Sequence, residues 1–229
     1  MHIHLLKRNK INVDKPTAIS IEFTKIYRVM ELRLLLGYSA YELSFLLGKN
    51  DFFVRDVENP LGTKRYNPDD TNYLLLIFNA QLPSIMLPKV EQNIYHLKVR
   101  SYLNEVKREV YEIAVKDPTG NSYSHFKTFE AEPKEIELPT LGILPSFEET
   151  RSYLDKLLTS AYFNNPKRAL DIFESCKSNF GDDFHPRNMI KVLNYYTNKK
   201  SGVPKLNKDK KDNFGRRLFI KRTDLDHYK

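Results

Sequence analysis

The fold is decided by residues 33–60, RLLLGYSAYELSFLLGKNDFFVRDVENP. In this stretch Ser39 is followed three residues later by Glu42, which is the capping-box pattern that predicts the start of a helix. Gly48 suits the left-handed residue that ends such a helix, and Asn50 is a residue type that caps the next one. The closing proline stops the second helix. The stretch therefore predicts two short helices joined by a tight turn.

This pattern resembles the helix-turn-helix of the Cro and lambda-repressor (XRE) family. The positions that match, without a gap, are Arg33, Gly37, Ser39, Glu42, Leu43, Leu47, Gly48, Val54, Val57 and Glu58. Their spacing places the apolar members in the angle between the helices and lets Glu58 reach back toward Arg33. Ser44 stands where the family usually has alanine, the small residue that lets the helices cross closely. With its flanking helices the resemblance covers residues 20–79.

The resemblance implies that the second helix contacts DNA. The family's outward positions fall on Asp51, Phe52, Arg55 and Asp56, so two carboxylates would face phosphates, and Ala40 replaces a glutamine that touches DNA in the family. Basic and amide side chains nearby can grip the backbone and a guanine, and an aromatic ring can touch a thymine methyl. The predicted DNA contacts in this part of the chain are Ser39, Lys49, Asn50, Phe52, Arg55, Lys64 and Arg65.

Helices are also predicted on both sides of this stretch. Upstream, apolar residues from Phe23 to Leu35 recur mostly at spacings of three and four. Downstream, Asn67 is placed to cap a helix with Pro68 in its first turn. We therefore predict a helix-turn-helix domain over residues 15–82.

The next segment changes from helical to strand-like patterning. Prolines break it up, and the run VYEIAV alternates before the turn signal DPTGN. These features predict a β-hairpin inside a connector of residues 83–145. Residues 91–108 fit neither the helical nor the strand period, and a helix is the preferred interpretation.

The connector is also the predicted pairing surface of a homodimer. Proteins of the resembled family usually bind as dimers on paired half-sites. The connector offers strand edges and aromatic residues such as Tyr111, Tyr123 and Phe126. A second copy of the chain is therefore kept as one alternative partner.

Three helices followed by a basic hairpin make up residues 146–222 and resemble a winged-helix domain. The resemblance implies that the polar face of the third helix enters the major groove and that the hairpin, as the wing, lies along phosphates. The predicted DNA contacts here are Arg187, Asn188 and Lys191 on the helix and Lys208, Lys210, Lys211, Arg216 and Arg217 on the wing.

All of the excess positive charge lies on or beside this hairpin. Residues 199–222 hold ten cations and two anions, a balance equal to the formal net charge of +8 for the whole chain. The rest of the chain is therefore neutral. Clustered cations bind phosphates by releasing counterions, which favours a nucleic-acid contact here over a solvated basic tail.

Motifs of enzymes and metal sites are missing from the sequence. There is no phosphate-cradling glycine loop, HExxH, GxSxG or pair of cysteines, and the six histidines are scattered. Cys176 is predicted to be a core residue rather than a nucleophile. No catalytic residue, metal or cofactor is therefore predicted. The longest apolar runs fall short of the roughly 20 residues that cross a bilayer, so we predict no membrane contact and a cytoplasmic location.

We predict an α+β fold, mainly α, with an N-terminal helix-turn-helix bundle, a central β-hairpin connector and a C-terminal winged-helix-like domain. The predicted function is sequence-specific binding of double-stranded DNA by a transcriptional regulator or repressor. The acidic side chains of the second helix favour an alternative, an adaptor that binds a protein partner on the helix-turn-helix scaffold, with nonspecific contact of its basic hairpin to nucleic acid. An RNA-binding module is a further alternative, because tyrosines can stack on bases.

Overall fold

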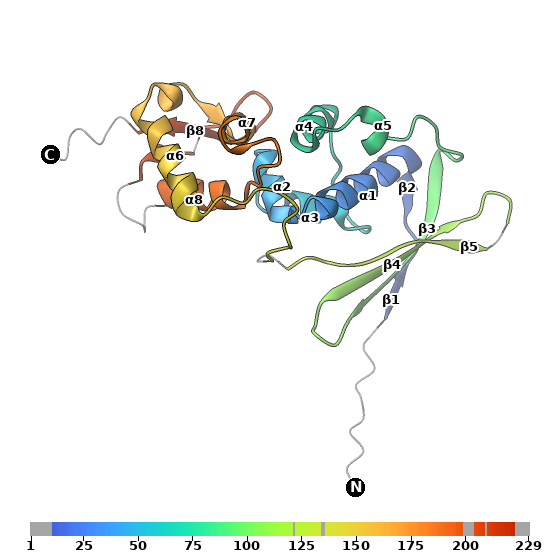
Figure 1. The fold of residues 1–229 in the computed structure, drawn as a ribbon. Helices are drawn as coiled ribbons and strands as arrows, with labels where there is room; N and C mark the ends of the chain where they lie inside the picture. Colours follow the sequence, from blue (N-terminus) through green and yellow to red (C-terminus); the bar gives the residue numbers. More distant parts are fainter. Residues whose placement is uncertain (1–10, 121, 134–135, 199–203, 209, 223–229) are drawn as a thin grey trace, which may run out of the picture.

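The computed structural model describes residues 11–120, 122–133, 136–198, 204–208 and 210–222. They form a mixed fold of helices and two antiparallel sheets. Figure 1 shows three parts in a row, with a helical bundle between a sheet of long strands and a C-terminal lobe of helices and short strands. The predicted combination of helices and strands is confirmed at this level.

The helical bundle is built from the first part of the chain. Its helices are α1 (Ser20–Leu35), α2 (Ala40–Leu46), α3 (Phe53–Glu58), α4 (Pro68–Phe78) and α5 (Leu82–Ile85). The predicted capping box is present at α2, because the Glu42 N–H donates to Ser39 Oγ at 3.2 Å and the Ser39 N–H donates to Glu42 Oε2 at 2.7 Å. Asn67 and Asp70 form an equivalent box at α4. Local sequence therefore sets where these two helices begin.

Helices α2 and α3 pack through the apolar residues predicted to lie between them. Leu43, Leu47 and Val54 have no exposed surface, and Val57 is 1% exposed. Ser44 joins the two helices, since its Oγ accepts the Val54 N–H at 3.0 Å. Burial of an aliphatic side chain of this size contributes roughly 1.5–3 kcal/mol, so this small contact is a main source of local stability.

A buried ion pair ties α1 to α3. Arg33 Nε donates to Glu58 Oε1 at 2.6 Å, which confirms the contact predicted between these residues. The same guanidinium donates to the Tyr38 carbonyl at 3.1 Å and pairs with Glu132, much further along the chain. Because Arg33 is completely buried, each of these acceptors replaces water that the guanidinium lost on folding.

Gly48 makes the turn between α2 and α3 possible. Its φ is +68°, in the left-handed region that glycine adopts freely and that a β-carbon disfavours. A Cβ at this position would also lie 2.9 Å from Arg216 Cβ in the C-terminal lobe. Backbone conformation and close packing therefore both require glycine here.

We expect Gly48→Ala to lower the free energy of unfolding by about 2 kcal/mol, because the left-handed conformation costs alanine about 1–2 kcal/mol and the contact with Arg216 adds strain. Gly215→Ala is the matched control, since its φ is +75° but no atom lies within 4 Å of the added Cβ. Denaturant unfolding of both variants measures the difference. Equal losses in the two variants would show that Arg216 does not press on the turn.

The sheet beside the bundle has five strands among the described residues. They are β1 (Asn12–Asp14), β2 (Thr17–Ile19), β3 (Ile94–Leu103), β4 (Glu109–Lys116) and β5 (Tyr123–Glu130). The strand order is β1-β3-β4-β5, and β2 also pairs with β3. The β-hairpin predicted around DPTGN is confirmed as β4 and β5. It belongs to a wider sheet that takes in two strands from before α1.

The helix predicted in residues 91–108 is wrong, because this segment forms β3. Buried positions alternate along the strand, with Leu97, Val99 and Ser101 turned inward. Strand β3 pairs with β4 on one side and with β1 and β2 on the other. The first two strands lie about 80 residues upstream, so tertiary pairing overrides an ambiguous local pattern.

One face of the sheet packs on α1 through aromatic rings. The centroid of the Phe126 ring lies 5.1 Å from that of Phe23 and 5.6 Å from that of Tyr27. Phe129 lies 5.7 Å from Tyr27 and 5.4 Å from Tyr111, which is 4% exposed. The prediction that Tyr111 and Phe126 pair two copies of the chain is therefore not supported, because α1 of the same chain covers the face that they line.

The C-terminal lobe consists of helices with short strands. It contains α6 (Phe147–Thr159), the 3₁₀ turn η1 (Tyr162–Asn164), β6 (Lys167–Arg168), α7 (Ala169–Phe180), α8 (Arg187–Thr197), β7 (Leu206–Asn207) and β8 (Leu218–Lys221). Its sheet has the order β6-β8-β7, with antiparallel pairing throughout. The three helices and two hairpin strands predicted for this region are confirmed, and β6 is an addition.

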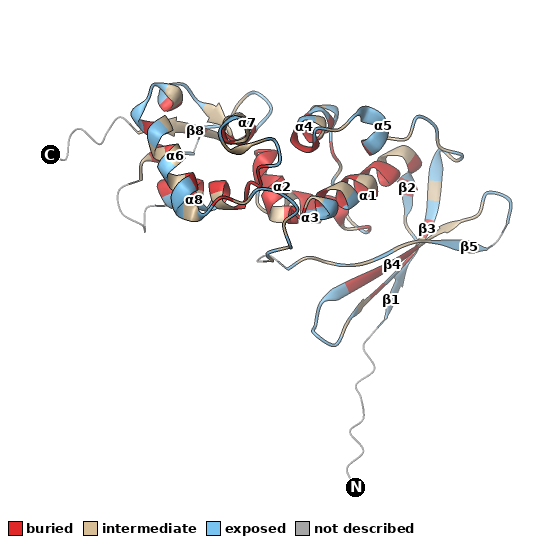
Figure 2. Cartoon of the chain, in the orientation of Figure 1, coloured by how far each residue is buried: buried red, intermediate tan, exposed pale blue. Residues whose placement is uncertain are grey.

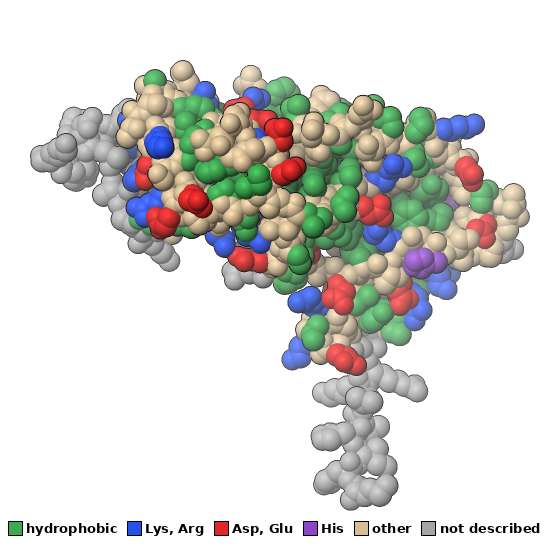
Figure 3. Space-filling model, in the orientation of Figure 1, with side chains coloured by type: hydrophobic (Ala, Val, Ile, Leu, Met, Phe, Trp, Pro, Cys, Tyr) green, Lys and Arg blue, Asp and Glu red, His purple; other side chains and the backbone are tan. Residues whose placement is uncertain are grey.

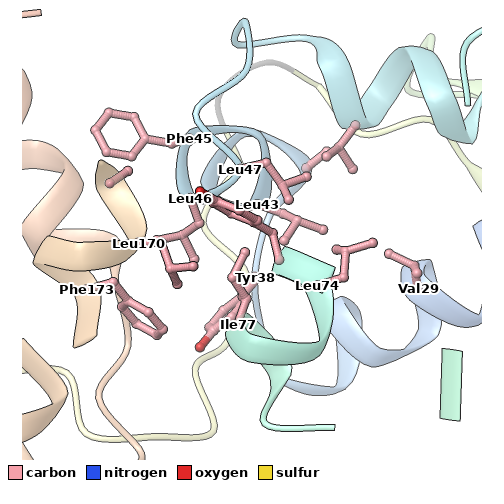
Figure 4. Packing of buried hydrophobic residues seen from close by; sticks show 14 of the residues in the cluster. Val29, Tyr38, Leu43, Phe45, Leu46, Leu47, Leu74, Ile77, Leu170 and Phe173 are labelled. Atoms are coloured by element: carbon pink, nitrogen blue, oxygen red, sulfur yellow. The ribbon is translucent and has the colours of Figure 1, made fainter. Parts of the chain in front are cut away.

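The bundle and the C-terminal lobe share one hydrophobic core. Figure 4 shows Leu46 of α2 next to Leu170 of α7, with Phe45 and Phe173 close by. The rings of Phe45 and Phe219 are 5.7 Å apart. Figure 2 shows buried residues continuing from α1 through α2 into the lobe. The lobe is therefore held by packing against α2 as well as by the chain that leads to it.

Candidate nucleic-acid interface

The hairpin of β7 and β8 is anchored on the turn between α2 and α3. The Arg217 backbone N–H donates to the Gly48 carbonyl at 3.0 Å. The Arg217 side chain pairs with Asp51, with Nη1 2.9 Å from Oδ1. Arg216 Nη1 donates to the Leu47 carbonyl. These contacts place the basic hairpin beside the helix that is predicted to read DNA.

Arg216 is buried in this contact. Its guanidinium pairs with Asp69 and, at 2.9 Å, with Asp70 in the first turn of α4. Its Cζ lies 3.7 Å from the centre of the Tyr73 ring. Lys49 Nζ brings a second cation to Asp70 at 3.0 Å. Lys49 and Arg216 are both predicted DNA contacts, but here they neutralise carboxylates at the start of α4, because buried charges need partners.

The polar face of α8 is turned toward α2. Arg187 Nε pairs with Glu42 at 3.0 Å, and Asn194 Nδ2 donates to the Tyr41 hydroxyl oxygen at 2.7 Å. Lys191 is exposed, and its Nζ lies 2.6 Å from a carboxylate oxygen of Glu137. The face that is predicted to enter the major groove therefore makes internal contacts. Asn188 is likewise engaged, since its Nδ2 donates to the Pro145 carbonyl at 2.8 Å.

The N-terminus of α2 is also occupied from within the chain. The Ala40 N–H donates to Glu132 Oε2 at 2.7 Å, and Arg33 Nη1 pairs with the other oxygen of the same carboxylate. In the helix-turn-helix resemblance this end of the helix faces the DNA backbone. A glutamate side chain takes up the backbone donor that would otherwise be available to a phosphate.

Three residues on and before α3 remain accessible. Arg55 is exposed, and its Cζ lies 4.5 Å from the centre of the half-buried Phe52 ring. Asn50 is exposed, and its Oδ1 accepts the Phe52 N–H at 3.1 Å. We call Asn50, Phe52 and Arg55 the turn surface. A guanidinium over an aromatic ring keeps its N–H donors available, which suits contact with a base edge or a phosphate.

The remaining predicted contacts near α3 serve the local structure. Lys64 Nζ lies 2.6 Å from Asp56 Oδ2, and Arg65 Nη1 donates to the Gly62 carbonyl at 2.9 Å. Ser39 is 3% exposed and holds the capping box of α2. Because Lys64 and Asp56 are both partly exposed, water and salt can separate that pair at small cost.

Lys208, Lys210 and Lys211 are exposed, and none of them forms an ion pair within the described residues. We call them the hairpin lysines. The Leu218 N–H donates to the Lys210 carbonyl at 2.9 Å, and Lys211 forms a β-bridge with Arg217. Backbone pairing therefore fixes this segment beside Arg217, whose side chain pairs with Asp51 just before α3. Lys199 and Lys200, which belong to the same basic run, lie outside the described residues.

Most other cations have acidic neighbours. On the face drawn in Figure 3, basic and acidic side chains are interspersed and form no extended patch of one sign. The sequence shows the number of cations but not their partners, and the acids that pair with Arg216 lie 146 and 147 positions away. The only local signal for these acids is their place at helix N-termini, where a carboxylate is favourable even without a partner.

Buried titratable groups in the C-terminal lobe serve the core. Burial raises the pKa of the Cys176 thiol to about 12, so it stays protonated at neutral pH, in agreement with its predicted place in the core. Burial lowers the pKa of His185, whose Nε2 lies 3.2 Å from the Gly37 carbonyl oxygen. Within the described ranges, no three His, Cys, Asp or Glu side chains are grouped in a way that could hold a metal ion. Nor does any helix there have the length and apolar character needed to cross a membrane.

Comparison with known proteins does not assign the chain to a family. No protein-family model, curated protein or solved structure shows significant similarity to the chain.

Proposed function

We propose that this protein is a cytoplasmic regulator that binds double-stranded DNA, with the hairpin lysines on phosphates and the turn surface at base edges. The observation that carries the proposal is the bond from the Arg217 N–H to the Gly48 carbonyl, 3.0 Å long. It places the hairpin lysines, which form no ion pair within the described residues, near the turn that precedes α3. Clustered lysines supply affinity through phosphates, and arginine and asparagine side chains are suited to base edges.

The topology of the C-terminal lobe supports this assignment. Its elements follow the order helix, strand, helix, helix, strand, strand, and β6 pairs with the final strand β8. This order supports a winged-helix-like lobe whose wing is the β7–β8 hairpin. In this proposal the wing contacts DNA together with α3 of the N-terminal bundle. It does not act with α8, because the polar face of α8 lies against α2.

Selection of bound duplexes from a random DNA pool tests the proposed function. A sequence-specific regulator enriches a motif, and a motif with two-fold symmetry would also indicate a dimer. Recovery of the pool without enrichment would reject sequence-specific binding. Variants in the turn surface should change the preferred bases, whereas variants in the hairpin lysines should weaken binding to all sequences alike.

We expect replacement of all three hairpin lysines by methionine to reduce the slope of log affinity against log salt by about 3, because each phosphate contact contributes about 0.9. Titration of the enriched duplex at several salt concentrations measures this slope. The control is a triple methionine variant at Lys89, Lys107 and Lys156, which are exposed elsewhere on the molecule. An unchanged slope in the hairpin variant, or an equal change in the control, would remove the hairpin from the DNA contact.

A protein adaptor is the second candidate function. It is favoured by one observation, namely that Glu132 and Arg217 already engage the α2 N-terminus and Asp51, two positions that would face DNA. The carboxylates of Glu132 and Asp51 at these two places would repel a phosphate. Failure of the random-pool selection, together with a salt-insensitive complex with a protein, would favour the adaptor.

A further inference from the structure

A cavity of about 880 Å³ lies between α2 and α8. Its walls include Tyr41 and Glu42 from α2 and Arg187, Ile190 and Asn194 from α8. Ile136 lines the cavity from the segment before α6, and Lys208 from the hairpin. Volumes of roughly 300–1,000 Å³ are typical of sites for small organic ligands, so the space is large enough for one.

The walls of this cavity are fixed in place. Arg187 Nε is 3.0 Å from Glu42 Oε1, and Asn194 Nδ2 donates to the Tyr41 hydroxyl at 2.7 Å, so two contacts bridge α2 and α8. Ile190 is 2% exposed and belongs to the core shared by the two lobes. The cavity is therefore a built feature of the lobe interface and not a gap between loosely associated parts.

Among the described residues, the charged side chains around the cavity include one cation without an acidic partner. Each carboxylate in the lining has a basic partner, with Glu42 paired to Arg187, Asp51 to Arg217 and Glu137 to Lys191. Lys208 also lines the cavity and has no ion-pair partner among the described residues. In the part of the chain that the structure describes, this leaves one positive charge in excess, which a single negative charge on a ligand balances, whereas a second would leave the site with a net negative charge.

We propose that this cavity binds an organic monoanion that has an apolar body and one carboxylate. The apolar body lies against Ile136, Ile190 and the Tyr41 ring, and the carboxylate pairs with Lys208 Nζ. The amide of Asn194 supplies further polar contact and favours one orientation of the ligand. The occupant is small and planar or short-chained, since it enters between two helices that are already bonded to each other.

Occupation of the cavity also opposes DNA binding, and this part of the inference rests on the proposed function. Lys208 is both a cavity residue and a hairpin lysine. A carboxylate paired with its ammonium removes one phosphate contact and adds a negative charge beside Asp51. The ligand therefore acts as an effector that weakens the DNA complex.

Calorimetric titration of the full chain tests ligand binding directly and needs no DNA. The probes are butyrate, hexanoate, benzoate and indole-3-acetate, with benzamide and indole-3-acetamide as neutral counterparts. We expect at least one carboxylate to bind with saturation and its amide to bind at least about fivefold more weakly, which is the size of effect that a partly exposed ion pair supports. The inference is overturned if none of the four carboxylates saturates the protein, or if the amides bind equally well.

Two matched pairs of variants locate the site. Lys208→Met should weaken carboxylate binding about fivefold, whereas Lys210→Met, on the same hairpin, should leave it unchanged. Ile136→Trp should abolish binding by filling the cavity, whereas Leu141→Trp, at a position that is 68% exposed, should not. Equal behaviour within either pair would place any observed binding outside this cavity.

The two proposals fail in different ways. If a carboxylate binds with the expected variant pattern but no duplex is bound, the cavity assignment stands and the proposed function fails. If duplex is bound but no carboxylate saturates the protein, the cavity assignment fails alone. If both bind, the carboxylate should lower duplex affinity in the wild-type chain and not in Lys208→Met, and an unchanged duplex affinity overturns the effector role.

Discussion

Replacement of Arg33 by methionine is expected to lower the free energy of unfolding by about 4–5 kcal/mol. The guanidinium has no exposed surface and bonds to Glu58, Glu132 and the Tyr38 carbonyl. Methionine leaves two poorly solvated carboxylates without a counter-charge, and breaking a buried ion pair from one side costs about 3–5 kcal/mol. Denaturant unfolding measures the loss, and a variant that is unfolded in water agrees with it.

The partners of Arg33 provide the rescue and the control. Adding Glu58→Gln and Glu132→Gln to Arg33→Met should restore more than half of the lost stability, because neutral amides do not need a counter-charge. Arg100→Met is the control, since its pair with Glu112 is 3.0 Å long but both side chains are substantially exposed, and its loss should stay below about 1 kcal/mol. A loss in Arg33→Met no larger than in this control would contradict the assigned role.

The loss in Arg33→Met should also depend on pH. Burial raises the pKa of the Glu58 carboxyl above its ordinary value of 4.5, while Arg33 holds it down. Without Arg33 this pKa rises further. An acid with a raised folded-state pKa gives stability that is present below its unfolded pKa and is lost as pH rises through the folded value. The free energy of unfolding of the variant should therefore fall further below that of the wild type at pH 8 than at pH 5. A difference that stays constant between these pH values would show that Glu58 does not titrate in this range.

Replacement of Arg216 by methionine should lower the free energy of unfolding by about 3 kcal/mol. The change removes the partner of Asp69 and one of two partners of Asp70, which is 1% exposed. Lys49 still pairs with Asp70, which keeps the cost at the low end of the range for a broken buried pair. Thermal and denaturant unfolding of the full chain measure the loss.

Arg217→Met is the matched comparison for Arg216. Arg217 is the next residue and pairs with Asp51, but 28% of its side chain is exposed. Its loss should cost less than about 1 kcal/mol in stability. If Arg216 instead reads or grips DNA, its replacement would weaken duplex binding while the free energy of unfolding stayed near that of wild type. That result would contradict the structural role.

Local patterns in the sequence predict the helical bundle well. Ser39 with Glu42 and Gly48 mark a helix start and a turn through bonds to near neighbours, so the information lies within about ten residues. Strand β3 differs, because its identity depends on pairing with β1 and β2 about 80 residues upstream. No local spacing contains that information, and a helix is the wrong interpretation for that reason.

The candidate site is harder to predict than the fold. The sequence correctly shows a basic hairpin, but it does not show that Arg216 is buried against Asp69 and Asp70 while Lys210 stays exposed. Both are cations in one short run. What separates them is the position of a distant helix N-terminus, which only the packing of α2 against the C-terminal lobe determines.

The shared core removes the chain's modularity. Separating the bundle from the C-terminal lobe would expose buried apolar residues on both halves. These are Phe45 and Leu46 on the bundle and Leu170, Phe173 and Phe219 on the lobe. Neither half could then be transplanted into another protein as a ready-made binding unit, because each would carry an aggregation-prone surface with it. Evolution of one half is likewise constrained by the other, so changes on the exposed turn surface and hairpin are tolerated only where they leave this shared packing intact.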